Sequence, residues 1–339
     1  MKHFEYYGLK LDPFSNTPDN RFYFNSDQHA AALAKIVYIA KSMKGLAVLI
    51  GDVGTGKTTL ARKLLQSLPE DKYEASMLVI IHSGITADWL LTKIAVQLGV
   101  ENPASEKIKL LGQLYHRLVE IHDGGKTAII LVDEAQMLKD REIMEEFRGL
   151  LNLELPGKKF ISFVLFGLPD LEENLKQDEP LNQRVALRYR LGYLNLESIE
   201  NYIKHRLRVA GGNKMLFTKE AVKSIQIFTR GIPRLINNLC DNVLLEGMLL
   251  KLERIDRSII EKIAHDLNMS AASEQEIKKI EEQKVTPVSV PLDAESEPAT
   301  TPLESKAQEA GISSFQEKEK KSHHEEVDID KLLDSLEVK

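Results

Sequence analysis

Cysteine is almost absent from this sequence, and long apolar runs are absent altogether. The single cysteine, Cys240, cannot form an internal disulfide, and its apolar neighbours predict a buried thiol, so a reducing compartment is favoured. No run approaches the ~18 apolar residues that span a bilayer, and the first residues lack the apolar core of a signal peptide. We therefore expect a cytoplasmic protein that reaches any membrane through a partner, at the inner face.

Basic charge is not in excess either, since the formal net charge is −6. Residues 270–339 carry 17 acidic side chains and 9 lysines, whereas residues 1–269 balance 34 acidic against 36 basic side chains. A near-neutral body gives no sign of a nucleic-acid surface, and the cluster Lys204, Arg206 and Arg208 fits a helix face better than a nucleic-acid site. The histidines show no metal-ligand spacing. Composition therefore argues against a nucleic-acid partner without excluding one.

The body of the chain divides into three regions. Residues 1–24 form an aromatic-rich arm that Pro13 and Pro18 break into extended pieces. Residues 25–193 alternate short apolar segments with helical patterns, and residues 194–269 are helical throughout.

The end of the chain differs in composition. Residues 270–339 are rich in Glu, Lys, Ser, Pro and Thr, and we expect a disordered acidic tail because such a segment cannot bury enough apolar surface to order. Within it, residues 327–336 have apolar side chains at helical spacing. That segment is either a solvated end or a short docking helix.

Five strands and five intervening helices are expected in residues 25–193. The strands are predicted at 46–50, 77–82, 128–133, 160–166 and 186–191, and the helices at 57–67, 87–98, 108–121, 141–153 and 171–176. The first four strands are nearly continuous apolar runs, which indicates a parallel sheet covered on both faces. The fifth alternates with Arg188 and Arg190 and suits an edge strand. This alternation predicts an α/β fold. A further helix, capped by Ser26, is expected before the first strand. Four helices are expected after the last strand, at 197–211, 218–229, 234–251 and 256–267.

The segment after the first strand matches the P-loop pattern GxxxxGK[ST] completely. Its glycines let backbone N–H groups wrap around phosphate oxygens at a helix N-terminus. Lys57 can reach the β- and γ-phosphates, and the Thr58 hydroxyl can ligate Mg²⁺. The nucleotide-binding candidates are Gly51, Asp52, Val53, Gly54, Thr55, Gly56, Lys57, Thr58 and Thr59. The loop therefore predicts binding of ATP with Mg²⁺.

The third strand ends in two adjacent carboxylates, Asp133 and Glu134. In a P-loop ATPase we expect Asp133 to hold Mg²⁺, together with Thr58. Glu134 would then orient and polarise the attacking water. The strand expected between the P-loop and this pair favours the branch of P-loop ATPases in which these two acids are neighbours.

Two arginines complete the set of candidates. Arg234 follows Gly231-Ile-Pro at the start of a helix, where its guanidinium could lie over the nucleotide phosphates. Arg184 precedes the last strand, where it could reach the γ-phosphate of a neighbouring subunit. A surface or ion-paired arginine remains the alternative for each.

These motifs and others resemble AAA+ ATPases of the general secretion pathway protein A (ExeA) type, with relatives in pilus biogenesis and in exopolysaccharide or PEP-CTERM loci. The matching segments are Tyr6-Tyr-Gly-Leu, Asp12-Pro-Phe, Thr17-Pro-Asp, Phe22-Tyr-Phe, His29, Gly51 to Thr59, Asp133-Glu-Ala-Gln, Glu146-Phe-Arg-Gly-Leu-Leu-Asn, Gln183-Arg, Tyr202-Ile-Lys-His-Arg-Leu and Gly231-Ile-Pro-Arg-Leu-Ile-Asn-Asn-Leu. The resemblance covers residues 1–267. It implies an AAA+ core with a helical lid, a homo-oligomer, Arg184 as arginine finger, Arg234 as lid sensor, and service to an envelope secretion, pilus or polysaccharide export system.

One departure and two rival functions stay open. The family usually carries Gln where this chain has Leu168, so a polar group near the γ-phosphate is missing and the hydrolysis rate is in doubt. A transposition-type ATPase of the TniB or MuB class would have a similar core but would need a basic, DNA-binding surface. A slow nucleotide-dependent switch would bind a partner without rapid turnover.

Residues 20–24 of the arm leave two alternatives open. They either form a wall of the adenine site or only pack on the core.

Overall fold

The computed structural model describes residues 2–17, 19–155 and 158–282. The tail from residue 283 onward, including the docking helix expected at 327–336, lies outside the described residues.

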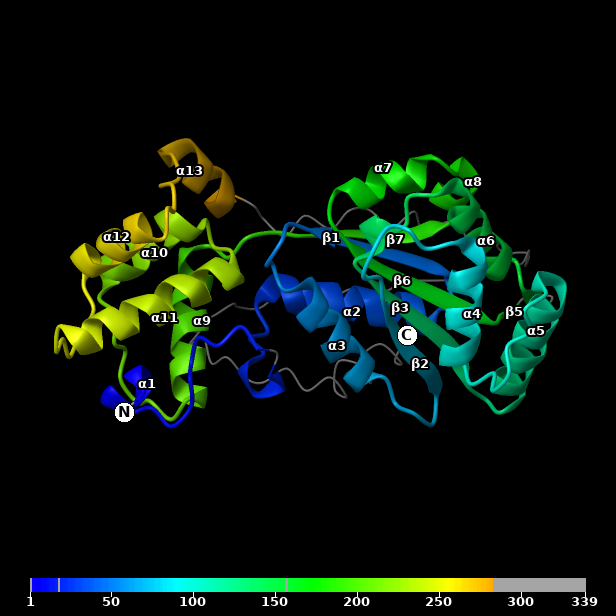
Figure 1. Ribbon diagram of the computed structural model, residues 1–339, viewed down its shortest axis with the longest axis horizontal. Helices are drawn as coiled ribbons and strands as arrows, with labels where there is room; N and C mark the ends of the chain where they lie inside the picture. Colours follow the sequence, from blue (N-terminus) through cyan, green and yellow to red (C-terminus); the bar gives the residue numbers. More distant parts are fainter. Residues whose placement is uncertain (1, 18, 156–157, 283–339) are drawn as a thin grey trace, which may run out of the picture. The chain divides into compact units, whose positions relative to one another are not determined.

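A five-stranded parallel sheet lies at the centre of residues 25–193 (Figure 1). The strands are β1 (Leu46–Gly51), β2 (Tyr73–Val79), β3 (Thr127–Asp133), β6 (Ile161–Gly167) and β7 (Val185–Leu191), in the order β2-β3-β6-β1-β7. All four pairings are parallel, which confirms the predicted sheet. A short hairpin, β4 (Glu154–Leu155) with β5 (Lys158–Lys159), was not predicted.

Helices cover both faces of this sheet. The helices are α2 (Asp27–Lys41), α3 (Lys57–Ser67), α4 (Ala87–Gln97), α5 (Lys107–Asp123), α6 (Arg141–Leu151), α7 (Asp170–Lys176) and α8 (Glu179–Asn182). Alternate β1 residues Leu46, Val48 and Ile50 pack in one core with α4, α5 and α6. Ala47 and Leu49 point to the opposite face, where α2 and α3 contact the sheet. This double coverage explains why the central strands are apolar throughout.

The second strand begins earlier than predicted. β2 spans Tyr73–Val79 and pairs residue by residue with β3, whereas the apolar run suggested 77–82. Because β2 is an edge strand, it tolerates the polar side chain of Glu74. Beyond its end, Ile81 is 80 % exposed, so the apolar run was a misleading boundary signal.

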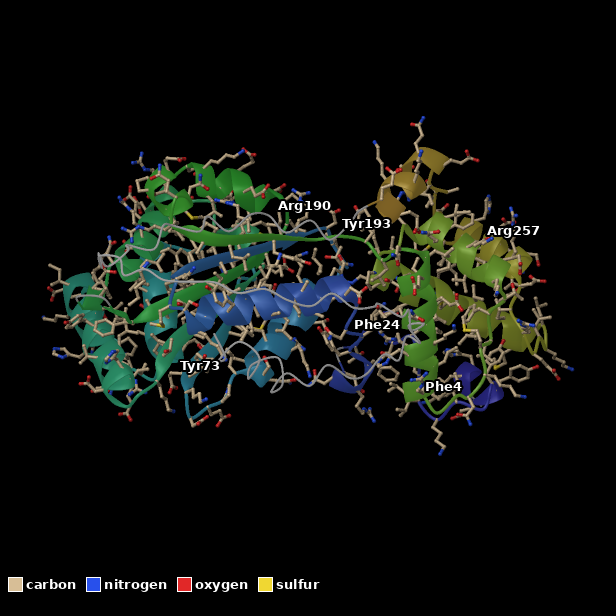
Figure 2. The ribbon with its side chains drawn as sticks, turned by 180° about the vertical axis from the view of Figure 1, so that it is seen from behind. Phe4, Phe24, Tyr73, Arg190, Tyr193 and Arg257 are labelled. Carbon is tan, nitrogen blue, oxygen red and sulfur yellow. The ribbon has the colours of Figure 1, made fainter. Side chains whose placement is uncertain are left out.

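A second core forms in the helical region. The predicted helices occur as α9 (Leu196–Val209), α10 (Lys219–Thr229), α11 (Pro233–Leu249) and α12 (Arg257–Asp266). Aromatic residues of the arm, which holds α1 (His3–Tyr6) and the short 3-10 helix η1 (Asn20–Phe22), complete this core: Phe4, Phe14 and Phe22 are buried among its side chains. Figure 2 shows Phe4 beside these helices. The arm is thus part of the helical core.

Arg206 anchors the arm to α9. Its guanidinium donates to the Ser15 carbonyl at 2.9 Å and to the Tyr202 hydroxyl at 2.9 Å, and lies 4.9 Å from the centre of the Phe22 ring. The three basic residues do lie on one helix, as expected, but Arg206 is buried under the arm. Lys204 and Arg208 are exposed, so only these two members of the cluster face solvent.

The ordered chain continues past the expected start of the tail at Ser270. Residues Glu274–Glu282 form helix α13, and Ile280 in it is only 4 % exposed. The Leu196 N–H donates to Glu281 Oε1 at 2.9 Å, and the Ala272 N–H donates to the Ile227 carbonyl at 2.9 Å. Composition averaged over a long tail hid this short amphipathic helix. No helix of the described ranges is long and apolar enough to cross a membrane.

These contacts of α13 predict unequal effects of two truncations. Ending the chain after Met269 removes the buried Ile280 and the hydrogen bonds of Glu281 and Ala272. It should lower the melting temperature by roughly 2–6 °C, because a buried Ile contributes about 1.5–3 kcal/mol. Ending it after Glu282 should leave the melting temperature unchanged. Thermal unfolding followed by circular dichroism measures both, and equal melting temperatures for the two truncations would contradict the docking of α13.

Candidate nucleotide-binding site

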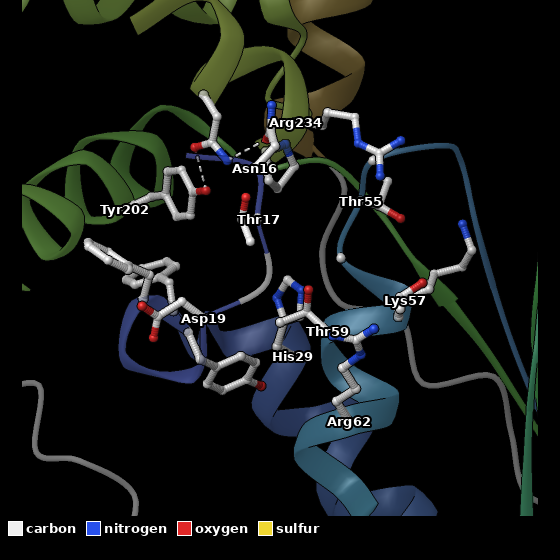
Figure 3. A pocket seen from close by; sticks show the side chains of 18 of the residues that line it. Asn16, Thr17, Asp19, His29, Thr55, Lys57, Thr59, Arg62, Tyr202 and Arg234 are labelled. Atoms are coloured by element: carbon white, nitrogen blue, oxygen red, sulfur yellow. Dashed lines mark hydrogen bonds between the residues drawn. The ribbon is translucent and has the colours of Figure 1, made fainter. Parts of the chain in front are cut away.

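A cavity of about 250 Å³ lies at the carboxyl end of β1. It is lined by the P-loop from Val53 to Thr59, by Glu134 and Leu168, by the arm around Asp19, and by Pro233 and Arg234 of α11. Figure 3 shows Lys57 and Arg62 of α3 on one side of this cavity and Arg234 of α11 on another. Three cations around one cavity fit an anionic ligand.

The P-loop has the backbone that its glycines permit. Gly54 and Gly56 have φ of 82° and 105°, in the left-handed region that favours glycine. A Cβ at Gly54 would lie 2.8 Å from Arg234 Cβ, and one at Gly56 would lie 2.9 Å from His29 Nε2. These two positions therefore require glycine for space as well as for conformation, and the loop forms a cradle closed by neighbours on two sides.

Lys57 is buried inside this cradle. Its ammonium donates to the carbonyls of Gly51 and Asp52 at 2.8 and 2.9 Å. Burial lowers the pKa of Lys57, while the nearby carboxylates of Glu134 and Asp133 oppose that shift. The cation is thus held close to where phosphate oxygens would bind, with partners that a phosphate can replace.

Asp133 and Thr58, the two expected Mg²⁺ ligands, lie side by side. Asp133, at the end of β3, is 1 % exposed, and its carboxyl is hydrogen-bonded to the Thr58 hydroxyl and the Glu134 N–H. Burial raises the pKa of Asp133, and these two hydrogen bonds oppose the rise. A carboxylate and a hydroxyl side by side are oxygen ligands of the kind Mg²⁺ takes, so these residues fit the ion.

The two candidate arginines lie in different places. The Arg234 N–H donates to the Gly54 carbonyl at 3.3 Å, and its side chain lines the cavity. Arg184 is half-buried between α8 and β7 and is not among the lining residues. The structure thus brings Arg234, but not Arg184, to the cavity of its own chain.

The link between β7 and α9 touches the P-loop, which the sequence did not predict. The Tyr193 hydroxyl donates to Asp52 Oδ2, and burial raises the pKa of Tyr193 to about 12. Tyr193 lies in the segment that leaves β7 (Figure 2). Next to it, the Leu194 N–H donates to the Gly231 carbonyl at 2.9 Å, and a Cβ on Gly231 would lie 2.0 Å from the Leu194 oxygen. No motif signals these long-range contacts.

His29 supports the P-loop from α2. Its Nδ1 lies 2.6 Å from the Ser26 hydroxyl, and the ring is also hydrogen-bonded to the backbone of Thr55. Burial lowers the pKa of His29 to about 4. Ser26 occupies the N-cap position as expected, yet its hydroxyl bonds to His29 in place of a helix N–H.

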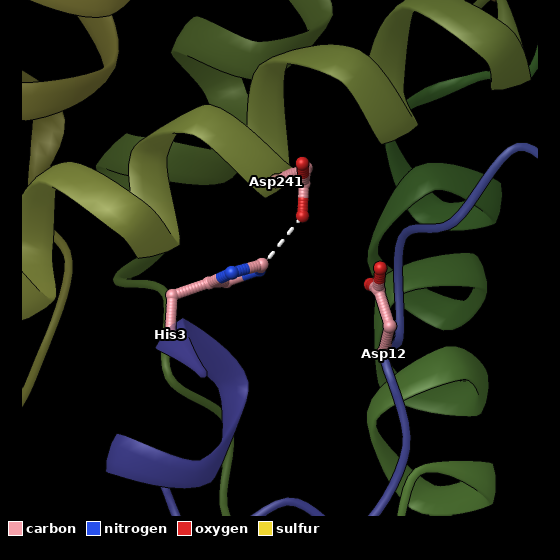
Figure 4. A group of neighbouring side chains, drawn as sticks. All are labelled: His3, Asp12 and Asp241. Carbon is pink, nitrogen blue, oxygen red and sulfur yellow. Dashed lines mark ion pairs between the residues drawn. The ribbon is translucent and has the colours of Figure 1, made fainter. Parts of the chain in front are cut away.

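A second group of charged side chains lies away from the cavity. His3, Asp12 and Asp241 approach within 4.8 Å of one another, and His3 Nε2 lies 2.8 Å from Asp241 Oδ1 (Figure 4). Burial raises the pKa of Asp241. This group fastens the arm to α11.

Comparisons with known proteins agree with this geometry. The sequence profile of the AAA domain family matches residues 40–175. General secretion pathway protein A of Aeromonas hydrophila is 35 % identical over 268 residues, 78 % of this chain. This chain has the P-loop AAA+ fold. It spans 48 % of the length of that relative, about half. The resemblance drawn from the sequence motifs is thereby confirmed, and a nucleotide-binding fold is established.

Solved AAA+ structures share the fold at low sequence identity. The ORC2 protein of Aeropyrum pernix superposes with a TM-score of 0.57 at 14 % identity, covering 78 % of this chain and 72 % of that chain. The ORC1 protein of the same organism, solved in complex with DNA, superposes with a TM-score of 0.55 at 17 % identity. The match covers 74 % of the present chain and 68 % of the ORC1 chain. At such identity the likeness concerns the fold alone.

The buried His29 predicts a loss of stability in mild acid. Its pKa is about 4 in the folded chain and about 6.5 when unfolded, so below pH 6.5 only the unfolded state gains the proton. Stability is therefore lost as the pH falls from 6.5 toward 4, by about 1 kcal/mol already at pH 5.5.

Urea unfolding at pH 7.5 and pH 5.5 measures this loss. His29→Gln should show a smaller loss than the unmodified chain, whereas His265→Gln, at an exposed position, should match the unmodified chain. An identical pH dependence for His29→Gln and the unmodified chain would contradict the assignment.

Proposed function

We propose that this chain binds ATP with Mg²⁺ in the P-loop cavity, hydrolyses it to ADP and phosphate, and uses the cycle to assemble or remodel an envelope secretion, pilus or exopolysaccharide export system. The observation that carries the ATPase part is the meeting of Lys57, Thr58, Asp133 and Glu134 at one end of the sheet. The likeness to general secretion pathway protein A supports the export part.

The roles of these residues follow from their positions. Lys57 exchanges its loop carbonyls for phosphate oxygens, and the P-loop N–H groups bind the same oxygens. Thr58 and Asp133 would hold Mg²⁺, which would neutralise charge on the phosphates when bound. Glu134 takes a proton from the attacking water as the new oxygen–phosphorus bond forms and the bond to the β-phosphate oxygen breaks. Arg234 neutralises phosphate charge from α11.

Arg184 acts on a neighbouring copy in this proposal. Within the described part of the chain its side chain makes no hydrogen bond or ion pair, and it lies outside the cavity of its own chain. A homo-oligomer would carry it to the cavity of the next subunit, where it serves as arginine finger. We further propose a cytoplasmic location, with membrane contact through a partner.

The rival functions make different predictions. A transposition-type ATPase should bind DNA with a strong dependence on salt, yet one cation of the basic cluster, Arg206, is buried under the arm. A slow switch should bind ATP with negligible turnover, and Leu168, which places an apolar side chain in the cavity, is the observation that favours it. Turnover and salt-dependent DNA binding separate the three.

Two substitutions test the phosphate site. Lys57→Ala should abolish ATP binding, because it removes the buried cation of the cradle. Glu134→Gln should bind ATP normally and lower kcat by roughly 10²-fold or more, because Thr58 and Asp133 remain. Calorimetric ATP binding and phosphate release measure these effects, with the exposed Lys72→Ala as control. Near-normal turnover by Glu134→Gln would place the catalytic base elsewhere.

Mixing of variants tests the finger in trans. Arg184→Ala should bind ATP normally and hydrolyse it ~10³-fold more slowly. Lys57→Ala cannot bind ATP but still carries Arg184, so mixed oligomers of the two should regain turnover. Arg257→Ala, an exposed i,i+4 ion-pair position, serves as control. Absence of recovery in mixtures that demonstrably co-assemble would count against the assignment.

A further inference from the structure

The carboxylate of Glu134 has a fixed partner. The amide nitrogen of Gln136 donates to Glu134 Oε2 at 2.6 Å. The amide oxygen of the same side chain accepts from the backbone N–H of Leu168 at 3.0 Å. One amide therefore links the end of β3 to the end of β6. Gln136 is 5 % exposed, so water does not compete freely for these bonds.

The surrounding chain holds Gln136 close to the end of β6. Glu134 has φ of 56°, which starts the short 3-10 helix η2 (Ala135–Met137) and turns Gln136 back toward β6. Asn174 Nδ2 donates to the main-chain carbonyl oxygen of Gln136 at 2.9 Å. A Cβ on Gly167 would lie 3.2 Å from Gln136 Oε1, so glycine leaves the amide its space.

The chemistry of the neighbours also fixes which way the amide points. A flipped amide would set its oxygen against the Glu134 carboxylate and its NH₂ against the Leu168 N–H, which places acceptor against acceptor and donor against donor. In the observed orientation both groups are satisfied. Leu168 lines the cavity with an apolar side chain, so its N–H is the polar group it offers to this network.

We propose that Gln136 is a positioning residue that holds Glu134 Oε2 and couples the water-activating carboxylate to the end of β6. This inference rests on the proposed hydrolysis. With Oε2 held by the amide, Oε1 is left to accept the proton of the attacking water. Without the amide, the carboxylate rotates freely, and fewer bound molecules have the base in line.

Single-turnover hydrolysis with enzyme in excess tests this coupling. Gln136→Met keeps the length of the side chain but removes both hydrogen bonds, and should slow hydrolysis roughly 10–100-fold with ATP affinity changed less than about threefold. In the Glu134→Gln background the same change should add no further loss, because a residue that acts through Glu134 has nothing left to position.

Two other variants keep the test decisive. Gln136→Glu is close in size and places a second carboxylate against Glu134, so it should also be slow even if Gln136→Met fails to fold. Gln113 makes a similar two-sided amide bridge far from the site, accepting from the Ala104 N–H at 2.8 Å and donating to the Asn102 carbonyl at 2.9 Å. Gln113→Met should leave the hydrolysis rate unchanged.

The outcomes separate the two proposals. Normal hydrolysis by Gln136→Met or by Gln136→Glu, or equal losses for Gln136→Met in both backgrounds, would overturn the positioning role alone. An unmodified chain that binds ATP without any turnover would overturn the proposed hydrolysis and, with it, the positioning role.

Discussion

Two opposite charges buried at the same end of the sheet determine much of this site. Lys57 and Asp133 are both removed from water, and burial alone would favour the neutral form of each. Each therefore needs close partners: loop carbonyls for the ammonium, and the Thr58 hydroxyl and a backbone N–H for the carboxyl. The P-loop backbone must remain in its cradle shape to supply them. The P-loop glycines and His29, which is hydrogen-bonded to the Thr55 backbone, help to keep the loop in this shape.

The sequence predicted the residues whose role depends on neighbours along the chain. The P-loop, the acidic pair and the order of strands and helices could be read because glycine, lysine and carboxylate spacing is local. Contacts that join distant segments could not be read. Tyr193 on Asp52, Arg206 under the arm and Gln136 on Leu168 depend on how separate elements pack, and single residues of these types carry no positional signal.

Where the predictions failed, local composition misled. An apolar run around Ile81 suggested strand, yet edge position and pairing with β3 decided the bounds of β2. A charged, polar average hid Ile277 and Ile280, whose spacing of three residues gives α13 an apolar side. Arg206 was grouped with its charged neighbours in the sequence. Its guanidinium in fact lies against the rings of Phe22 and Tyr202 and donates to the Ser15 carbonyl, so it is buried between α9 and the arm.

The contact between Gly231 and Leu194 limits how the helical region can move. Because a single hydrogen bond and near-zero clearance join these two backbones, the turn that leads into Arg234 cannot slide past the segment that leaves the sheet. Rotation of the helices about that segment must therefore carry the arginine with it. The position of this cation in the lining of the cavity therefore depends on the orientation of the helical region. In the function proposed above, a partner that binds the helices would move the Arg234 guanidinium relative to the phosphates without contacting the cavity.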